Sequence, residues 1–407
     1  MCEPKSFELF GNLGVWKYFC VMRIAVTAIF LNSGPLEGYG HYSLELLRNL
    51  VEQPSQHSFL FLYDRPIKAL PLQHPRITHL FVGPATRHPL SQAIWYHFFA
   101  PRQVRKWRAD VWLQPYGFSS FLVKTPQLTI VHDLAPFRLP DAIPWYHRWH
   151  YRLFTGKALQ KATLLACVSS ATRNDLQRIF PFLQSRQISL LPGAPRPGFQ
   201  SLTWEEKMEI KNKYTGGNEY FLVAGSIHPR KDLITVLKAF SLFKSWQKSN
   251  MKLVIAGRWA WQNESLQQKI STYKYRDELI ITGYVPEDAL YQLTGAAYAL
   301  IYPSLLEGFG LPIVEAMQAG VPVIASRQPA LIETGGAAAL YFEAGDPEDL
   351  YQKCLRLYKD ESLKSRNILE GCRQATLFSW QQTATELNRL LEANIASKRI
   401  EGESAKS

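Results

Sequence analysis

"SLLEGFGLPIVEAMQAGVPVIAS", residues 304–326, decides the fold because it links a strand to a helix through a glycine turn. The preceding residues 298–303 form a short apolar run that is typical of a buried strand. Gly308 and Gly310 favour a tight turn, and Pro312 suits the start of a helix. The free amides and the dipole at such a helix start favour an anionic ligand.

Two glutamates in this stretch, Glu307 and Glu315, change the kind of ligand that we expect. Ionised carboxylates repel phosphate oxygens and accept hydrogen bonds, and a vicinal diol offers two donors at a matching spacing. A sugar nucleotide, which has an acidic middle and hydroxyl-rich ends, would satisfy the glycine turn and both carboxylates. An ordinary strand–turn–helix with acids near the helix start is the alternative, and this stretch alone leaves it open.

Length and composition predict a globular protein with two domains. The chain has 407 residues, of which 46% are hydrophobic and 20% charged. The net charge of +12 is compatible with nucleic acid, an anionic membrane surface or acidic ligands, and does not choose among them. The five cysteines have no metal-binding spacing, which indicates a reducing compartment without a disulfide framework. The sequence contains no apolar run of about twenty residues, so we expect no membrane-spanning helix.

Strand-like and helix-like segments alternate along the chain, as in parallel sheets that helices cover on both faces. The pattern runs once before a stretch rich in proline and glycine, residues 192–206, and restarts after it. We therefore expect an α/β protein with two doubly wound domains, residues 22–200 and 201–375, that face each other across a cleft. The remaining segments are a leading extension of unassigned role at 1–21, with Met22 as an alternative start, and a polar tail at 396–407.

A cationic loop follows the first strand of the second half, in "VAGSIHPRKDL", residues 223–233. The strand ends at Gly225, and Arg230 and Lys231 come just before the next helix. Two cations at a helix start form a strong diphosphate site, because their charges add to the helix dipole. A solvated basic loop is the alternative. The glycine turn in the same half of the chain favours the diphosphate site.

Two weaker signals lie in the first half. Gly38 and Gly40 fall between the first predicted strand and helix, where glycines let a ligand approach backbone amides, although a plain turn explains them more simply. His132 ends an apolar strand, and could hydrogen-bond a sugar hydroxyl or steady a charge. A histidine satisfied by neighbouring backbone is an almost equal alternative.

The segment at residues 88–110 mixes aromatic side chains with Arg102, Arg105, Lys106 and Arg108. Such a segment could make a peripheral contact with an anionic membrane, and a solvated helix face is the commoner alternative. The common phosphate-loop, zinc, serine-hydrolase and dithiol motifs are absent from the sequence, as is a D-x-D pair for a diphosphate-bound metal. We therefore expect no metal, no cofactor and no nucleic-acid partner.

Residues 283–326 resemble the signature of the retaining glycosyltransferases of family 4, which have the GT-B fold, with Glu307 and Glu315 as its E-x7-E element. The resemblance extends from Met22 to about residue 392. The P-R-K form of the cationic loop resembles a subgroup of bacterial mannosyltransferases of polysaccharide assembly. The family also implies that a C-terminal helix, residues 376–395, crosses back to the first domain.

The resemblance implies a role for each predicted residue. Glu315 would accept hydrogen bonds from the ribose diol, and Glu307 would accept them from hydroxyls of the donor sugar. Lys231 and Arg230 would hold the diphosphate. His132 would lie beside the donor sugar. Backbone near the donor would come from Gly38, Gly40, Gly225, Ser226, Gly308, Phe309, Gly310 and Leu311. Many relatives carry an arginine where Ser226 stands, and we predict that Arg230 substitutes for that cation.

The function expected from the resemblance is transfer of a hexose with retention, without a metal, in the cytoplasm or at the inner face of the membrane. We expect first that mannose is transferred from GDP-mannose to a hydroxyl of a glycan or lipid-linked acceptor. Transfer from a UDP-sugar, epimerisation of a sugar nucleotide, and a basic surface-binding protein without catalysis are the alternatives. No residue pattern in the sequence distinguishes guanine from uracil.

Overall fold

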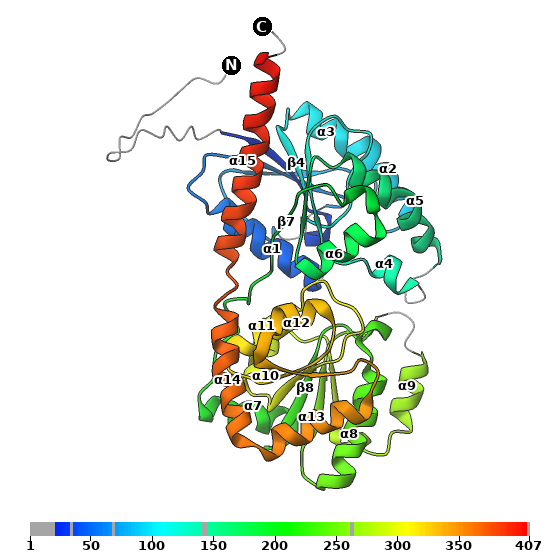
Figure 1. Cartoon of the computed structure of the whole chain (residues 1–407), viewed down its shortest axis with the longest axis vertical. Helices are drawn as coiled ribbons and strands as arrows, with labels where there is room; N and C mark the ends of the chain where they lie inside the picture. Colours follow the sequence, from blue (N-terminus) through cyan, green and yellow to red (C-terminus); the bar gives the residue numbers. More distant parts are fainter. Residues whose placement is uncertain (1–20, 33–35, 67–69, 141–144, 261–263, 405–407) are drawn as a thin grey trace, which may run out of the picture.

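The computed structural model describes residues 21–32, 36–66, 70–140, 145–260 and 264–404. The predicted extension at 1–21 lies outside these ranges, apart from Val21. Two α/β domains are stacked along the long axis of the molecule, and the long C-terminal helix runs beside the first of them (Figure 1).

The first domain is built on a parallel sheet in the order β3-β2-β1-β4-β5-β6-β7. Its strands are short and mostly buried, because helices cover both faces of a parallel sheet. The strands are β1 (Arg23–Thr27), β2 (Ser58–Tyr63), β3 (Ile77–Phe81), β4 (Val111–Gln114), β5 (Gln127–Val131), β6 (Leu164–Cys167) and β7 (Ile188–Leu190). Its helices are η1 (Ile29–Asn32), α1 (Gly38–Val51), α2 (Pro89–Ile94), the π-helix η2 (Trp95–Phe99), α3 (Ala100–Lys106), α4 (Ala135–Arg138), α5 (Trp145–Lys161), α6 (Ser170–Ile179) and η4 (Pro181–Leu183).

The second domain repeats this arrangement with the parallel order β10-β9-β8-β11-β12-β13. Its strands are β8 (Tyr220–Ala224), β9 (Lys252–Ala256), β10 (Leu279–Gly283), β11 (Ala299–Tyr302), β12 (Val323–Ser326) and β13 (Ala339–Phe342). Its helices are α7 (Trp204–Thr215), η5 (Pro229–Lys231), α8 (Leu233–Gln247), α9 (Glu264–Ser271), η6 (Arg276–Glu278), α10 (Glu287–Gly295), α11 (Leu311–Gln318), α12 (Pro329–Gly335), η7 (Gly336–Ala338), α13 (Pro347–Lys359) and α14 (Glu361–Ala375).

In both sheets the strand order reverses beside the first strand, between β1 and β4 and between β8 and β11. Doubly wound sheets bind ligands at this point, outside the carboxyl ends of the strands. Loops from the carboxyl ends of both sheets line one pocket between the domains. The prediction of two doubly wound domains facing across a cleft is therefore confirmed.

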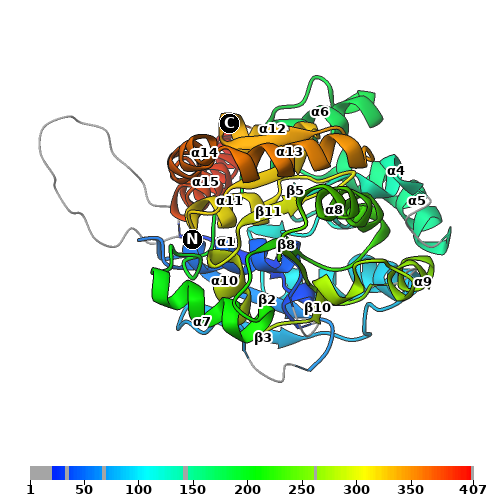
Figure 2. The same ribbon diagram turned by 90° about the horizontal axis from the view of Figure 1, so that it is seen from below.

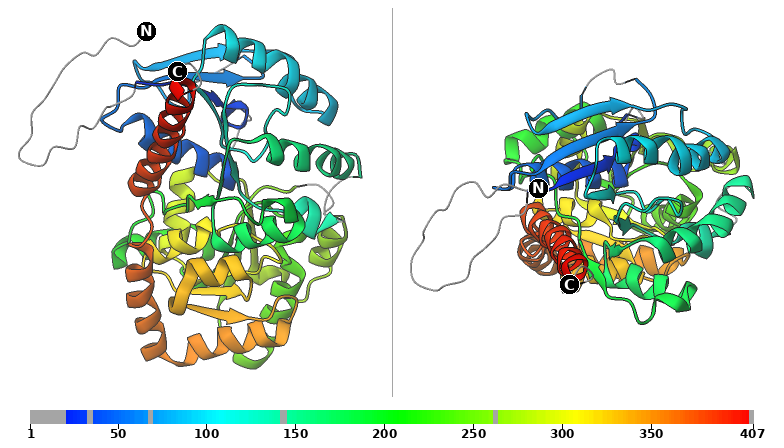
Figure 3. Two further views of the ribbon diagram at one scale, coloured as in Figure 1. Left: turned by 45° about the horizontal axis from the view of Figure 1, so that its top comes forward. Right: turned by 90° about the horizontal axis from the view of Figure 1, so that it is seen from above.

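The C-terminal helix α15 (Trp380–Ser404) packs against α1, as the resemblance implied (Figure 3). Ala384, Leu387 and Leu391 are buried at helical spacing, and Asn388 Oδ1 lies 3.0 Å from His57 Nε2. The predicted polar tail at 396–407 continues this helix as far as Ser404. Polarity alone does not end a helix, and this segment contains good helix formers and no proline.

The glycine turn before α11 is one of the places where the second domain contacts the first. Ser169 Oγ donates to the Gly308 carbonyl at 2.6 Å, and Thr172 Oγ1 donates to the same oxygen at 3.2 Å. A Cβ atom added to Gly308 would lie 1.6 Å from the carbonyl oxygen of His132. Only glycine therefore allows the two backbones to approach this closely.

The Gly308→Ala variant tests this contact. We expect a lower free energy of unfolding, by about 1–3 kcal/mol, because a methyl group would force the two domains apart. Thermal unfolding of the full chain measures the change, with Gly156→Ala in α5 as the control, where the nearest atom to an added Cβ lies 3.5 Å away. Equal melting temperatures for Gly308→Ala and the unchanged chain would contradict the tight domain contact.

Candidate active site

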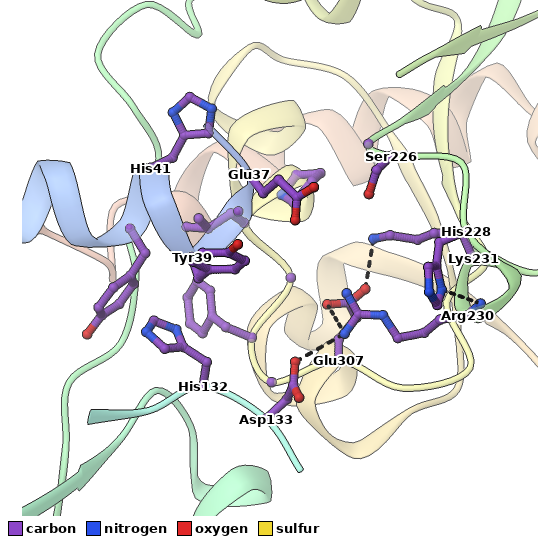
Figure 4. Close-up of a pocket in the computed structure, with 18 of the residues that line it drawn as sticks. Glu37, Tyr39, His41, His132, Asp133, Ser226, His228, Arg230, Lys231 and Glu307 are labelled. Atoms are coloured by element: carbon purple, nitrogen blue, oxygen red, sulfur yellow. Dashed lines mark hydrogen bonds and ion pairs between the residues drawn. The ribbon is translucent and has the colours of Figure 1, made fainter. Parts of the chain in front are cut away.

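The pocket between the domains has a volume of about 560 Å³. Most of the predicted site residues line it: Gly38, His132, Gly225, Ser226, Arg230, Lys231, Glu307, Gly308, Phe309, Gly310, Leu311 and Glu315. Figure 4 shows Glu37, Tyr39 and His41 on the α1 side of the pocket and Ser226, Arg230 and Lys231 on the other.

Glu307 lies at the centre of the cationic wall of the pocket. Its Oε1 accepts a hydrogen bond from Lys231 Nζ at 2.7 Å, and its Oε2 lies 4.0 Å from Arg230 Nη1. Burial pushes the pKa of Glu307 up, but Arg230 and Lys231 outweigh it and lower the pKa to about 2. Glu307 is therefore ionised at neutral pH, and can only accept hydrogen bonds.

The two cations of the loop are held in different ways. Lys231 Nζ also donates to the Tyr302 hydroxyl at 2.7 Å and is buried against that ring. Arg230 Nη1 donates to Asp133 Oδ2 at 3.1 Å, which joins the loop to the first domain. The charge of Glu307 raises the pKa of Arg230, so this guanidinium stays charged. Asp133 adjoins the predicted His132, but its pairing across the cleft is not visible in the sequence.

His132 is a neutral hydrogen-bonding group at the end of β5. Its Nε2 lies 2.7 Å from the Pro115 carbonyl, and since a carbonyl can only accept, Nε2 carries the proton. Burial lowers the pKa of His132, although the bond to Pro115 opposes this shift. The remaining nitrogen, Nδ1, is then an acceptor. A neutral ring of this kind can accept from a hydroxyl, but it cannot supply positive charge.

The predicted glycines differ in their positions. Gly38 and Gly40 form the first turn of α1 and do not precede it, because the helix starts one turn earlier than the apolar pattern indicated. Gly38 lines the pocket, whereas Gly40 is buried against Leu36 and is not a lining residue. Gly225 has a φ of +120°, a conformation that favours glycine, and it brings the end of β8 close to the Lys231 side chain.

Glu315 has a partner that the sequence did not reveal. Arg196, in the linker between the domains, donates from Nε to Glu315 Oε1 at 2.6 Å and from Nη1 to Glu287 Oε1 at 2.6 Å. His41 of α1 lies 3.1 Å from the same oxygen of Glu287, and with Arg196 it lowers the pKa of Glu287 to about 2. Arg196 therefore fixes one oxygen of Glu315 and joins elements of both domains.

A further cation, Arg258, lies beside the loop in which Ser226 stands. Arg258 follows β9, lines the pocket and forms an ion pair with Glu37 across the cleft. A Cβ on the neighbouring Gly257 would lie 3.2 Å from the Ser226 amide nitrogen. The pocket thus contains a further arginine, Arg258, in the segment that lies beside Ser226, where many relatives carry an arginine.

Carboxylates in this pocket are compensated by basic side chains and do not cluster. Among the described residues, no group of three or more His, Cys, Asp or Glu side chains could hold a metal ion. The carboxylates that line the pocket, each paired with a basic side chain, are Glu37, Asp133, Glu287, Glu307 and Glu315. No described helix is both long enough and apolar enough to cross a membrane.

Comparison with known proteins agrees with this geometry. Residues 205–371 match the family described as glycosyl transferases group 1. The chain is 26% identical over 378 residues to O-antigen chain mannosyltransferase B of Escherichia coli, covering 86% of this chain and 95% of that one. It is 28% identical over 230 residues to O-antigen chain mannosyltransferase RfbU of Salmonella typhimurium, covering 56% of this chain and 60% of the other.

Solved structures establish the fold. Sucrose-phosphate synthase from Thermosynechococcus elongatus aligns with a TM-score of 0.77 at 17% identity, covering 92% of this chain and 100% of that one. WaaG, a glycosyltransferase involved in lipopolysaccharide biosynthesis, aligns with a TM-score of 0.70 at 13% identity, covering 90% of this chain and 99% of the other. The predicted GT-B fold is thereby confirmed. The resemblance to the glycosyltransferases is supported over residues 205–371 by the family match.

A double-mutant cycle on Arg196 and Glu315 tests the linker contact. We expect Arg196→Met to cost roughly 3–5 kcal/mol of unfolding free energy, because it leaves a buried carboxylate unpaired. The double variant with Glu315→Gln should recover much of this loss, as measured by denaturant unfolding. The exposed pair of Glu386 and Arg389 in α15 is the matched control and should show no measurable coupling. Additive losses at Arg196 and Glu315 would show that their contact does not stabilise the chain.

Proposed function

We propose that the chain is a retaining hexosyltransferase of polysaccharide biosynthesis, and the match of residues 205–371 to the group 1 glycosyl transferases supports this proposal. Mannose moves from GDP-mannose to a hydroxyl of a glycan or lipid-linked acceptor, without a metal or other cofactor. The enzyme works in the cytoplasm, at the inner face of the membrane. No nucleic acid takes part.

One observation carries this proposal: an ionised Glu307 lies between two cations on the wall of a pocket of suitable size. The pocket offers positive charge for a diphosphate and carboxylate oxygens for sugar hydroxyls, which is the combination that a sugar nucleotide needs. The similarity to an O-antigen chain mannosyltransferase, which extends over 95% of that protein, supports mannose as the sugar.

The chain's own residues would position the donor and stabilise charge. The acceptor oxygen forms a bond to the anomeric carbon from the face that the diphosphate leaves. The bond from that carbon to the diphosphate oxygen breaks, and the departing oxygen takes the acceptor's proton. Arg230 and Lys231 offset the charge that develops on the diphosphate. His132 accepts a hydrogen bond from a sugar hydroxyl through Nδ1 and so helps to position the donor. No side chain needs to act as a nucleophile.

Two other functions are less well supported. Transfer from a UDP-sugar is suggested by structures such as that of HepE from Anabaena in complex with UDP and glucose, but at 15% identity that structure shows similarity of fold alone. An epimerase would need carboxyl groups that carry protons. Glu287 and Glu307, both with pKa values lowered to about 2, are poorly suited to that chemistry.

Incubation with GDP-mannose or UDP-glucose and a polyprenyl-linked sugar acceptor separates these functions. Transfer to the acceptor with retained anomeric configuration supports the proposal. An epimerised donor identifies an epimerase, and unchanged donor and acceptor favour a protein that binds without catalysis.

Removal of the Arg230 guanidinium should weaken the enzyme directly. We expect Arg230→Ala to lower kcat/KM about 100-fold, since one of the cations at the diphosphate is lost, and Arg230→Lys to restore part of the activity. Arg327→Ala, at an exposed pair with Glu343 in the same domain, is the control and should change little. Unchanged donor affinity and turnover in Arg230→Ala would mean that Arg230 does not replace the missing arginine.

Nucleotide preference tests the donor. In a thermal-shift experiment we expect GDP to raise the melting temperature of the full chain more than UDP at equal concentration, because tighter binding to the folded state gives more stabilisation. Guanosine and uridine without phosphates are the controls and should have little effect. A larger shift with UDP would move the donor to the uridine sugars.

A further inference from the structure

Exposed apolar side chains form two rows on neighbouring helices of the first domain. Leu90, Ile94 and Phe98 are exposed one helical turn apart on α2 and η2, and Trp149 and Leu153 are exposed one turn apart on α5. Trp149 is 61% exposed and Phe98 62%. We call these five residues the α2–α5 surface.

The two rows of this surface belong together in the fold. Helix α2 packs against α5, and Figures 1 and 2 both place α5 on the side of the molecule opposite α15. Aromatic contacts join the rows from beneath. His97 of η2 lies 4.0 Å from Phe121 and 6.1 Å from Phe154 of α5, measured between ring centroids. The exposed side chains therefore stand on a common, packed base.

Positive charge surrounds the α2–α5 surface. Residues 65–132 contain nine lysines and arginines and one acid, Asp110, whose carboxylate accepts a hydrogen bond from the Arg23 amide at 2.7 Å. Helix α5 has basic residues and no acid. The basic side chains exposed on α3 and α5 include Arg102, Arg105, Lys106, Arg152 and Lys157.

Helix α5 connects this surface to the active site. Its inner face contributes Tyr151, Thr155 and Leu159 to the wall of the pocket. Its outer face presents Trp149 and Leu153 to solvent. A partner that covers the outer face would thus lie one helix diameter, about 10 Å, from the pocket wall.

We propose that the α2–α5 surface docks on an anionic phospholipid bilayer. The apolar side chains enter the interface, and the surrounding lysines and arginines contact the acidic headgroups. A second copy of the chain fits less well, because two strongly basic surfaces would face each other. The docking rests on the proposed function in one respect, since it brings a lipid-linked acceptor to the pocket.

Vesicle flotation of the full chain tests the docking. We expect binding to phosphatidylcholine vesicles that contain phosphatidylglycerol, weak binding to phosphatidylcholine alone, and loss of binding at high salt. Trp149→Ser with Leu153→Ser should lower the binding constant about tenfold or more. The matched control is Trp204→Ser with Leu369→Ser in the second domain, where the two side chains are 70% and 54% exposed. This control should bind like the unchanged chain.

Several results would overturn the docking. The first is that the unchanged chain does not bind anionic vesicles, and the second is that both double variants lose vesicle binding equally. The third is that the chain forms a dimer in solution which the substitutions Trp149→Ser and Leu153→Ser dissociate. A parallel thermal-shift experiment with GDP distinguishes this failure from failure of the proposed function. Vesicle binding without a GDP-induced rise in melting temperature would contradict the proposed function and support the docking. A rise in melting temperature without vesicle binding would contradict the docking and leave the proposed function supported.

Discussion

The buried charge of Glu307 is the feature on which the arrangement of the cleft depends. A carboxylate removed from water needs compensation, and here Lys231 provides it at 2.7 Å and Arg230 at 4.0 Å. Arg230 in turn pairs with Asp133 of the first domain. One charge network therefore determines both the electrostatics of the pocket and a contact between the domains. The same groups that we propose to bind hydroxyls and phosphate also join the two domains.

The fold places this network by topology. The two sheets share one order over six strands, and the first sheet adds β7 at its edge. The loops after β8 and β11 therefore meet beside the reversal point of the second sheet, and those after β1 and β4 do so in the first. The contact at Gly308 then brings the two carboxyl edges together. Arg196 adds a second network from the linker, which reaches Glu315 and Glu287. Two ion-pair networks, one around Glu307 and one around Arg196, thus hold the pocket walls.

Local patterns were sufficient to predict the fold and much of the site. The E-x7-E stretch and the cationic loop are short, and their residues stay together whatever the domains do. The pairing of Arg196 with Glu315 spans 119 positions, so it depends on domain packing and leaves no local signal. The edge strand β3 is partly exposed and lacks a continuous buried run, so its sequence gives a weaker strand signal than the central strands do. Gly40 was predicted near the ligand because the start of α1 was placed one turn too late.

A crystal structure of the chain soaked with GDP-mannose would show whether Glu307 and the two cations hold the donor. We expect the diphosphate to contact Lys231 and Arg230, the mannose hydroxyls to donate to Glu307, and the base and ribose to lie toward Glu315. A donor that is bound elsewhere, or one that lies in the pocket with its diphosphate away from both cations, would contradict this expectation.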